Sequence, residues 1–247
     1  MVAKAACGPL LCVWRGGTRN GYNTDVAPGF FSKFFGGGEK NAAGEPVSSK
    51  DRIQRRSTGF QEFMKTIGRE ENIWVLDLGP TSPSNIKIIT ERGHRIYNED
   101  VLKEANGAEL KTKSIDPCKE GQTVVDVTRY LAENLKHDRE KFDAVMAWDI
   151  PDYLPEEVVK PTIERIHTIM KPGGMLLAFF HTKDAGPDAP YFRYHIADAQ
   201  TLELQKGPQF RLQRVFNNRH IENLFRDYAS IKFFLGRDNI REVLVIR

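Results

Sequence analysis

The sequence predicts an α/β fold in which helices cover both faces of a mostly parallel sheet. The first observation is a nearly continuous apolar run at 73–78 that stops at Gly79-Pro80, which is typical of a strand buried on both faces. Two more apolar runs, 142–148 and 175–180, are separated by a segment with helical spacing of its apolar residues. Finally, two closing strands are joined by so short a turn that they must be antiparallel.

Composition indicates a single soluble globular domain. The chain has 247 residues, of which 40% are apolar and 28% are charged, and its net charge of +3 gives no strong signal for nucleic-acid binding. Its three cysteines lack disulfide or zinc spacing, which predicts a reduced, cytoplasmic protein. No apolar run approaches the ~20 residues that span a membrane, and the six histidines show no ligand spacing, so we expect no metal site.

Residues 1–50 differ from the rest, because they are rich in glycine and small polar residues and have no sustained period. We expect a flexible N-terminal extension there, followed by one domain at 51–247. Phe30, Phe31, Phe34 and Phe35 would form one aromatic face of a helical turn and are a candidate contact for a protein partner. The alternative is an arm that folds back on its own domain or stays disordered.

In the first half of the domain, capping residues and apolar spacing define the elements. Ser82 or Ser84 can cap the helix that follows the first strand. In chain order we expect a helix capped near Ser57 or Thr58 that ends at Gly68, a strand at 73–78, a helix from about Asn85 to Gly93, a strand at 94–100, irregular chain at 101–120, a weak strand at 121–127 and a helix at 128–135.

The second half begins with the strand at 142–148. A helix containing 159–170 follows, with Pro161 in its first turn, and Lys171-Pro172-Gly173-Gly174 ends it. The remaining elements are a strand at 175–180, a polar loop at 182–195, a hairpin of 201–205 and 210–216, a helix from Asn217 or Asn218 to about Tyr228, and closing strands at 230–235 and 242–246.

Three of these segments resemble a known family. Asp77-Leu78-Gly79 resembles the start of the glycine motif of class I S-adenosylmethionine (SAM)-dependent methyltransferases, and 142–155 and 170–180 resemble that family's fourth strand and the turn into its fifth. The resemblance covers about 57–247. It implies a Rossmann-like three-layer sandwich with seven strands in the order 3-2-1-4-5-7-6 and an antiparallel last strand. Thr81 and Pro83 stand where the family has its second and third glycines.

The carboxyl ends of the predicted parallel strands should form one rim, where open α/β sheets bind their ligands. For a SAM site, the backbone from Gly79 to Ser82 would approach the methionine part and Glu99 or Asp100 would accept hydrogen bonds from the ribose. The candidate cofactor-binding residues are Asp77, Gly79, Pro80, Thr81, Ser82, Glu99, Asp100 and Trp148.

The candidate catalytic residues are Asp149 and His181, which follow the fourth and fifth strands. Asp152, Tyr153, Tyr191 and Tyr194 are candidate acceptor-binding residues. Ordinary alternatives exist: Asp149 and Asp152 as turn residues, His181 as a structural histidine, and Tyr191 and Tyr194 as part of a surface loop. Glu99 and Asp100 can likewise be solvated or cap the next helix.

The sequence therefore predicts a SAM-dependent methyltransferase that acts on a small molecule. A methyltransferase-like binding or scaffold protein that has lost catalysis is the alternative, because Thr81 and Pro83 replace glycines. A nicotinamide-dependent oxidoreductase is disfavoured by the missing glycines and by the antiparallel last strand.

Overall fold

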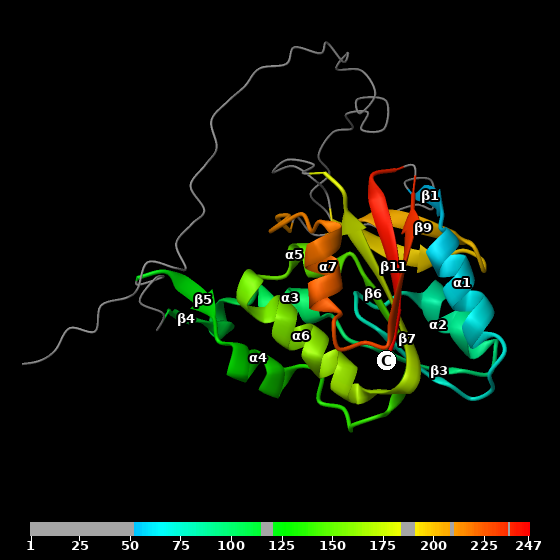
Figure 1. The fold of residues 1–247 in the computed structure, drawn as a ribbon, viewed down its shortest axis with the longest axis horizontal. Coiled ribbons are helices and arrows are strands. Elements are labelled where there is room, and N and C mark those ends of the chain that lie inside the picture. The colour runs from blue at the N-terminus through cyan, green and yellow to red at the C-terminus, as the bar shows by residue number, and fades with distance from the viewer. Residues whose placement is uncertain (1–51, 115–120, 184–190, 208–209, 237) are drawn as a thin grey trace, which may run out of the picture. The chain divides into compact units, whose positions relative to one another are not determined.

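The computed structural model describes residues 52–114, 121–183, 191–207, 210–236 and 238–247, so the predicted extension at 1–50, with its four phenylalanines, lies outside the described residues. Its central element is a six-stranded sheet in the order β10-β11-β7-β6-β2-β3, with β11 antiparallel to both neighbours and the β3-β2-β6-β7 pairs parallel (Figure 1). The strands are β2 (Trp74–Asp77), β3 (Arg95–Asn98), β6 (Phe142–Trp148), β7 (Met170–His181), β10 (Ser230–Leu235) and β11 (Ile240–Ile246).

This order is the one expected from the sequence, with one strand missing. If β2, β3, β6, β7, β10 and β11 are numbered 1, 2, 4, 5, 6 and 7 as in the expected order, the sheet runs 2-1-4-5-7-6. The antiparallel strand is β11, which takes the seventh position. The expected third strand does form, as β5 (Thr123–Val125), but it pairs with β4 (Lys111–Lys113) in a separate two-stranded sheet. The predicted seven-stranded sheet is therefore corrected to six, and β3 is an edge strand.

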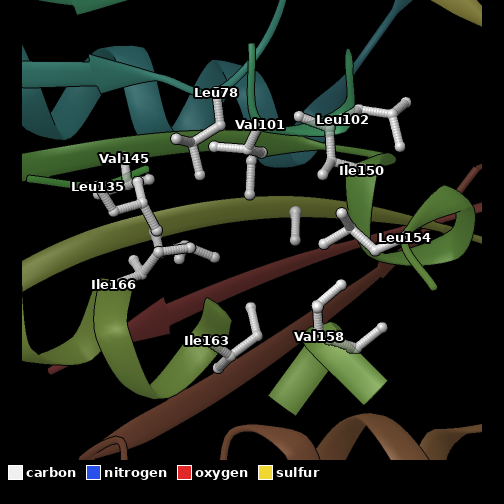
Figure 2. Packing of buried hydrophobic residues seen from close by; sticks show 14 of the residues in the cluster. Leu78, Val101, Leu102, Leu135, Val145, Ile150, Leu154, Val158, Ile163 and Ile166 are labelled. Atoms are coloured by element: carbon white, nitrogen blue, oxygen red, sulfur yellow. The ribbon is translucent and has the colours of Figure 1, made fainter. Parts of the chain in front are cut away.

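Helices cover both faces of the sheet, as predicted (Figure 1). On one face, Phe60, Phe63 and Ile89 from α1 and α2 are fully buried against the sheet. On the other, leucine, isoleucine and valine side chains from α3 to α6 and from the sheet form a second apolar layer (Figure 2). The helices are α1 (Thr58–Ile67), α2 (Pro83–Thr90), α3 (Val101–Ala105), α4 (Val127–Glu133), α5 (Ile150–Tyr153), α6 (Glu156–Ile169) and α7 (Asn218–Leu224), with a 3₁₀ turn η2 (Ala108–Leu110).

The helix starts follow local capping chemistry. Ser57, Ser82 and Asn217 cap α1, α2 and α7, each accepting a hydrogen bond from a backbone N–H of the first turn, as the sequence predicted. Asp100 caps α3 in the same way, through the N–H of Lys103. The prediction of irregular chain at 101–120 was therefore wrong at its start, where three buried residues, Val101, Leu102 and Ala105, lie on one side of a short helix.

The predicted polar loop at 182–195 was wrong over its last residues. Residues 192–196 form β8 (Phe192–Ile196), which pairs with β9 (Thr201–Lys206), and β9 pairs with β1 (Ile53–Arg56) to give a three-stranded antiparallel sheet. Residues 184–190 lie outside the described residues. The predicted hairpin was also wrong in its partner, since β9 pairs with β8 and β1 while 210–216 form no strand.

Two boundaries around α6 differ from the expectation. The helix begins at Glu156, so Pro161 lies inside it, beyond the first turn; the acidic side chains of Glu156 and Glu157 favour this earlier start. The strand β7 begins directly afterwards and includes Gly173 and Gly174. Gly173 has a φ of +77°, and a Cβ on Gly174 would lie 2.8 Å from the carbonyl oxygen of Lys171, so the turn segment requires glycines.

A buried ion pair joins the small sheet to the last strand of the large one. Arg55 on β1, with 7% of its surface exposed, places Nη2 2.8 Å from Oε1 of Glu242 on β11, which is 2% exposed. The other oxygen of Glu242 accepts the backbone N–H of Gly59 at the start of α1. Asp238 also accepts from Arg55. Among the described residues, no helix is long and apolar enough to cross a membrane.

We predict that Glu242→Gln lowers the free energy of unfolding by about 3 kcal/mol, because it leaves the buried Arg55 guanidinium with one anionic partner fewer. For a domain of this size that corresponds to a melting temperature about 6–12 °C lower. Glu203→Gln is the matched control, because Glu203 pairs with Arg52 at a site where both side chains are more than a quarter exposed. That change should lower stability by less than about 1 kcal/mol. Equal melting temperatures for the two variants would contradict the importance of the buried pair.

Candidate functional site

A cavity of about 810 Å³ lies at the carboxyl ends of β2 and β3. Its walls come from the loop after β2, the segment after β3 with α3, the end of α4, β8 and the chain after β9. The lining residues are Pro80, Thr81, Glu99, Asp100, Lys103, Glu104, Glu133, Asn134, Arg193 and Phe210. The volume falls within the ~300–1,000 Å³ usual for small-molecule sites, and the position is where open α/β sheets bind ligands.

Asp77, the last residue of β2, is buried beside this cavity and is fully hydrogen-bonded. Its Oδ1 accepts from Trp148 Nε1 at 2.6 Å, and its Oδ2 accepts from the side-chain amides of Asn85 at 2.8 Å and Asn98 at 3.1 Å. Burial raises the pKa of Asp77 to about 6, although the three hydrogen bonds oppose that shift. The carboxylate therefore joins β2, α2, β3 and β6.

Asn85 extends this network to β8. Its amide group donates to Asp77 and to the backbone oxygen of Tyr194, and its Oδ1 accepts from the N–H of Ile196 at 2.7 Å. Ser82 reaches the same strand, because its Oγ lies 2.8 Å from His195 Nδ1. The loop after β2 is thus covered by β8, so part of the surface predicted to approach a ligand contacts the chain itself.

Trp148 ends β6 in a conformation that is rare for a bulky side chain, with φ at +49°. The register between β6 and β7 shifts at this point, and the shift turns the indole toward Asp77. The ring stacks on Tyr194, with centroids 5.0 Å apart and parallel planes. Such strained residues tend to occur at functional sites.

Glu99 and Asp100 both line the cavity but are engaged differently. Glu99 accepts the backbone N–H of Leu135 with Oε1, and its Oε2 lies 3.0 Å from His137 Nε2, so it holds the chain after α4. Asp100 uses Oδ1 to cap α3. Its Oδ2 has no protein partner in the described part of the chain, which leaves it available to a ligand.

A second polar cluster lies at the ends of β6 and β7. Asp152 Oδ2 accepts the backbone N–H of His181 at 2.6 Å and lies 2.8 Å from His181 Nδ1. Asp149 Oδ2 accepts the hydroxyl of Tyr194 at 3.1 Å. Both carboxyl groups are buried, at 1% and 0% exposure, and each has one oxygen, Oδ1, without a hydrogen-bond partner.

Burial and neighbouring charges shift the pKa values in this cluster. Burial raises the pKa of Asp149 to about 7, although the nearby His181 imidazole opposes the shift. For His181, burial lowers the pKa, but the hydrogen bond to Asp152 and the charges of both carboxyl groups outweigh it and the pKa is raised. A carboxyl group with a pKa of about 7, next to an imidazole whose pKa is raised, can accept and release a proton.

The predicted tyrosines also lie in this region. Tyr153 packs edge-on against His181, with centroids 5.8 Å apart, and against Tyr191 at 5.2 Å. Tyr191 in turn contacts Phe210, which lines the cavity. All three tyrosines are buried. Tyr153 belongs to α5, Tyr194 belongs to β8, and Tyr191 directly precedes β8.

The predicted residues fall into two neighbouring groups. Pro80, Thr81, Glu99 and Asp100 line the cavity, while Asp77, Ser82 and Trp148 lie in the network beneath it. Gly79 lies against the same network, since a Cβ there would be 3.4 Å from Cδ1 of Trp148. The predicted catalytic and acceptor-binding residues form the second cluster. Asn85 and Asn98 were not predicted as site residues, because their contacts with Asp77 depend on elements that meet only in the folded chain. No group of three or more His, Cys, Asp or Glu in the described ranges is arranged to hold a metal ion.

We predict that Asp149 makes stability fall as pH rises from about 4 to about 7. Because its pKa is higher in the folded protein than the ordinary 3.8, the unfolded chain ionises first, and the folded state loses relative stability until pH passes about 7. Asp149→Asn keeps an acceptor for Tyr194 and removes this contribution. Relative to the variant, wild type should lose about 2–3 kcal/mol between pH 5 and pH 8, measured by urea unfolding. Parallel pH profiles would contradict the raised pKa.

Comparison with known proteins yields likeness in structure alone. No protein family and no curated protein matches the sequence. A methyltransferase of Burkholderia thailandensis, solved with 1,6-didemethyltoxoflavin and S-adenosylhomocysteine, is 14% identical with a TM-score of 0.41, over 77% of this chain and 78% of that one. SAM-dependent methyltransferases of Aquifex aeolicus and Mesorhizobium loti are 14% and 11% identical, each with a TM-score of 0.42, over 76% and 77% of this chain and 88% and 98% of theirs.

These superpositions are too loose to assign a site or a substrate. The strand order is a property of this chain itself, and so is the antiparallel β11 between β7 and β10. By that order, and with one strand fewer than expected, the chain has the Rossmann-like fold of class I methyltransferases.

Proposed function

We propose that the protein is a SAM-dependent methyltransferase that acts on a small-molecule acceptor. The observation that carries this proposal is the cavity of about 810 Å³ at the carboxyl ends of β2 and β3, in a sheet with the strand order of that fold. Its size suits a small ligand, and its position is the usual one for ligands of open α/β sheets.

The residues on the cavity wall fit the nucleoside part of SAM. Asp100 offers an oxygen without a protein partner, and a carboxylate suits the two hydroxyl groups of a ribose. Phe210 offers an apolar surface and Pro80 and Thr81 offer the loop after β2. Glu99 supports this wall by holding the chain at Leu135 and His137. When bound, SAM supplies a methyl group that its sulfonium makes reactive.

Other residues of the chain would place the acceptor and move a proton. Gly79 to Ser82 and Trp148 would lie along the methionine side, next to the ionised Asp77. Asp149 and His181 would receive the proton that an acceptor loses, because burial raises the pKa of Asp149 to about 7 and the two carboxyl groups raise the pKa of His181. The acceptor would be bound by Asp152, Tyr153, Tyr191 and Tyr194. These residues lie behind Phe210 of the cavity wall, which contacts Tyr191.

One observation favours the second candidate, a binding protein without catalysis. The loop after β2 is tied to β8 by Asn85 and by the contact of Ser82 with His195, and Thr81 and Pro83 replace the family's glycines. A cofactor would have to share this covered loop. The nucleoside side of the cavity is open, so the two candidates differ in whether SAM binds at all.

We predict that Asp100→Ser weakens binding of S-adenosylhomocysteine by at least about tenfold in isothermal titration. Serine is a good N-cap, so α3 is retained, but the change removes the carboxylate that would pair with the ribose. Hydrogen bonds to a charged group are worth ~1.5–3 kcal/mol each, which exceeds the 1.4 kcal/mol that corresponds to tenfold.

The matched control is Asn217→Ser, which alters the N-cap of α7, where Asn217 accepts from the N–H of His220. It should leave the affinity unchanged. Unaltered affinity in Asp100→Ser would place the ribose elsewhere. Absence of binding of both SAM and S-adenosylhomocysteine to wild type at millimolar concentration would exclude the methyltransferase and leave the binding protein.

A further inference from the structure

The two buried aspartates at the end of β6 lie on one helical turn. Asp149 is the N-cap of α5 and Asp152 is its third residue, and the backbone N–H of Asp152 donates to the oxygen of Asp149 at 3.1 Å. Residues three apart lie on the same side of a turn. The Oδ1 atoms of both are buried and have no hydrogen-bond partner in the part of the chain that the structure describes.

Two such oxygens need an explanation, because buried polar atoms are nearly always hydrogen-bonded and an unpaired buried anion is strongly disfavoured. The positive groups that act on the pair are few. His181 is hydrogen-bonded to Asp152, and Arg241 on β11 acts on Asp152 from a distance while its Nη1 donates to the backbone of Phe216. One imidazole hydrogen-bonds to one of the two carboxyl groups, and Asp149 has a neutral partner, the hydroxyl of Tyr194.

The surroundings suit an organic cation. Tyr153, Tyr191 and Tyr194 are buried around the pair, and burial raises the pKa of each phenol above its ordinary value, so all three are neutral. Neutral aromatic rings attract cations at their faces. A carboxylate next to aromatic rings is therefore a site for an alkylammonium group.

We propose that Asp149 and Asp152 bind the positively charged amino group of the acceptor, so that the substrate is an amine. This inference rests on the proposed methyltransferase function and specifies its substrate class. The two Oδ1 atoms accept hydrogen bonds from the ammonium, which supplies donors that these two atoms lack among the described residues and a charge beside both carboxyl groups.

The chemistry requires one proton transfer by the chain. An ammonium N–H bond breaks, its electron pair stays on nitrogen, and the proton goes to Oδ1 of Asp149. The neutral amine then has the lone pair that forms the new N–C bond, while the S–C bond of the donor breaks and its electrons stay on sulfur in S-adenosylhomocysteine. The product is a methylated ammonium ion that already carries the positive charge, and Asp149 returns its proton to solvent after the product leaves.

The amine reaches the pair past Tyr191. That ring is 1% exposed and contacts Phe210 at the cavity wall on one side, with centroids 5.4 Å apart, and Tyr153 on the other. An acceptor that enters from the cavity therefore displaces the Tyr191 ring from its place between Phe210 and Tyr153. Tyr191→Ala removes the ring from this path, so small amines should reach the two carboxyl groups in that variant through the remaining rings of Tyr153 and Tyr194.

The test is isothermal titration of wild type, saturated with S-adenosylhomocysteine, with phenethylamine and with 2-phenylethanol. The two probes share their shape and differ in the ammonium. We expect phenethylamine to bind at least about tenfold more tightly. Asp152→Asn should abolish that preference and Asp149→Asn should reduce it. Asp227→Asn is the matched control, since that carboxylate is 65% exposed, and it should change nothing.

The outcomes are distinct. Failure of S-adenosylhomocysteine to bind wild type refutes the proposed function itself. If S-adenosylhomocysteine binds but phenethylamine and 2-phenylethanol bind with equal affinity, the amine inference is wrong. It is also wrong if neither probe binds to wild type and neither binds to Tyr191→Ala. If Asp149→Asn and Asp152→Asn weaken binding of SAM but not of S-adenosylhomocysteine, the carboxylates hold the sulfonium instead, which also overturns the inference. Circular dichroism and melting temperature confirm that each variant is folded.

Discussion

The buried carboxylate of Asp77 is the interaction on which the arrangement of the site depends. Its position at the end of β2 gives it three side-chain donors, one each from α2, β3 and β6. A buried anion is tolerated when its hydrogen-bonding capacity is filled, and its removal leaves those donors unsatisfied. The three donors fix the indole of Trp148, the start of α2 and the end of β3 relative to one another, so the rim is built around this one group.

This constraint also explains why the rim has an open half and a covered half. Asn85 donates to Asp77 and binds β8 on its other side, which draws the small sheet across the loop after β2. The cavity is left over the ends of β2 and β3, where Asp100 has an oxygen without a protein partner. The aspartate and tyrosine cluster lies behind Tyr191 and Phe210. This arrangement supports our proposal of a nucleoside site and an acceptor site separated by aromatic rings.

The large sheet could be predicted because its signals are local. The strands at 73–78 and 142–148 are apolar runs bounded by turns, and Ser57 and Ser82 cap the next helices with their own side chains. The sequence supplies candidate site residues but not their contacts. Tyr191 and Tyr194 are separated from Trp148 by more than forty positions and were expected in a polar loop. Their burial arises from the pairing of β8 with β9, and nothing in the local pattern of 182–195 indicates that pairing. The predicted place of the third strand in the large sheet was wrong for the same reason. The strand forms as β5, but tertiary contacts decide its partner, which is β4.

The central claim is that the cavity at the ends of β2 and β3 holds the nucleoside of SAM. A crystal structure of the protein grown with S-adenosylhomocysteine tests it most directly. The account predicts density for the ribose at Asp100 and for the adenine along the wall that includes Phe210, with the sulfur directed toward Trp148. Density for the nucleoside at any other surface, or an unchanged cavity at saturating ligand, would contradict it.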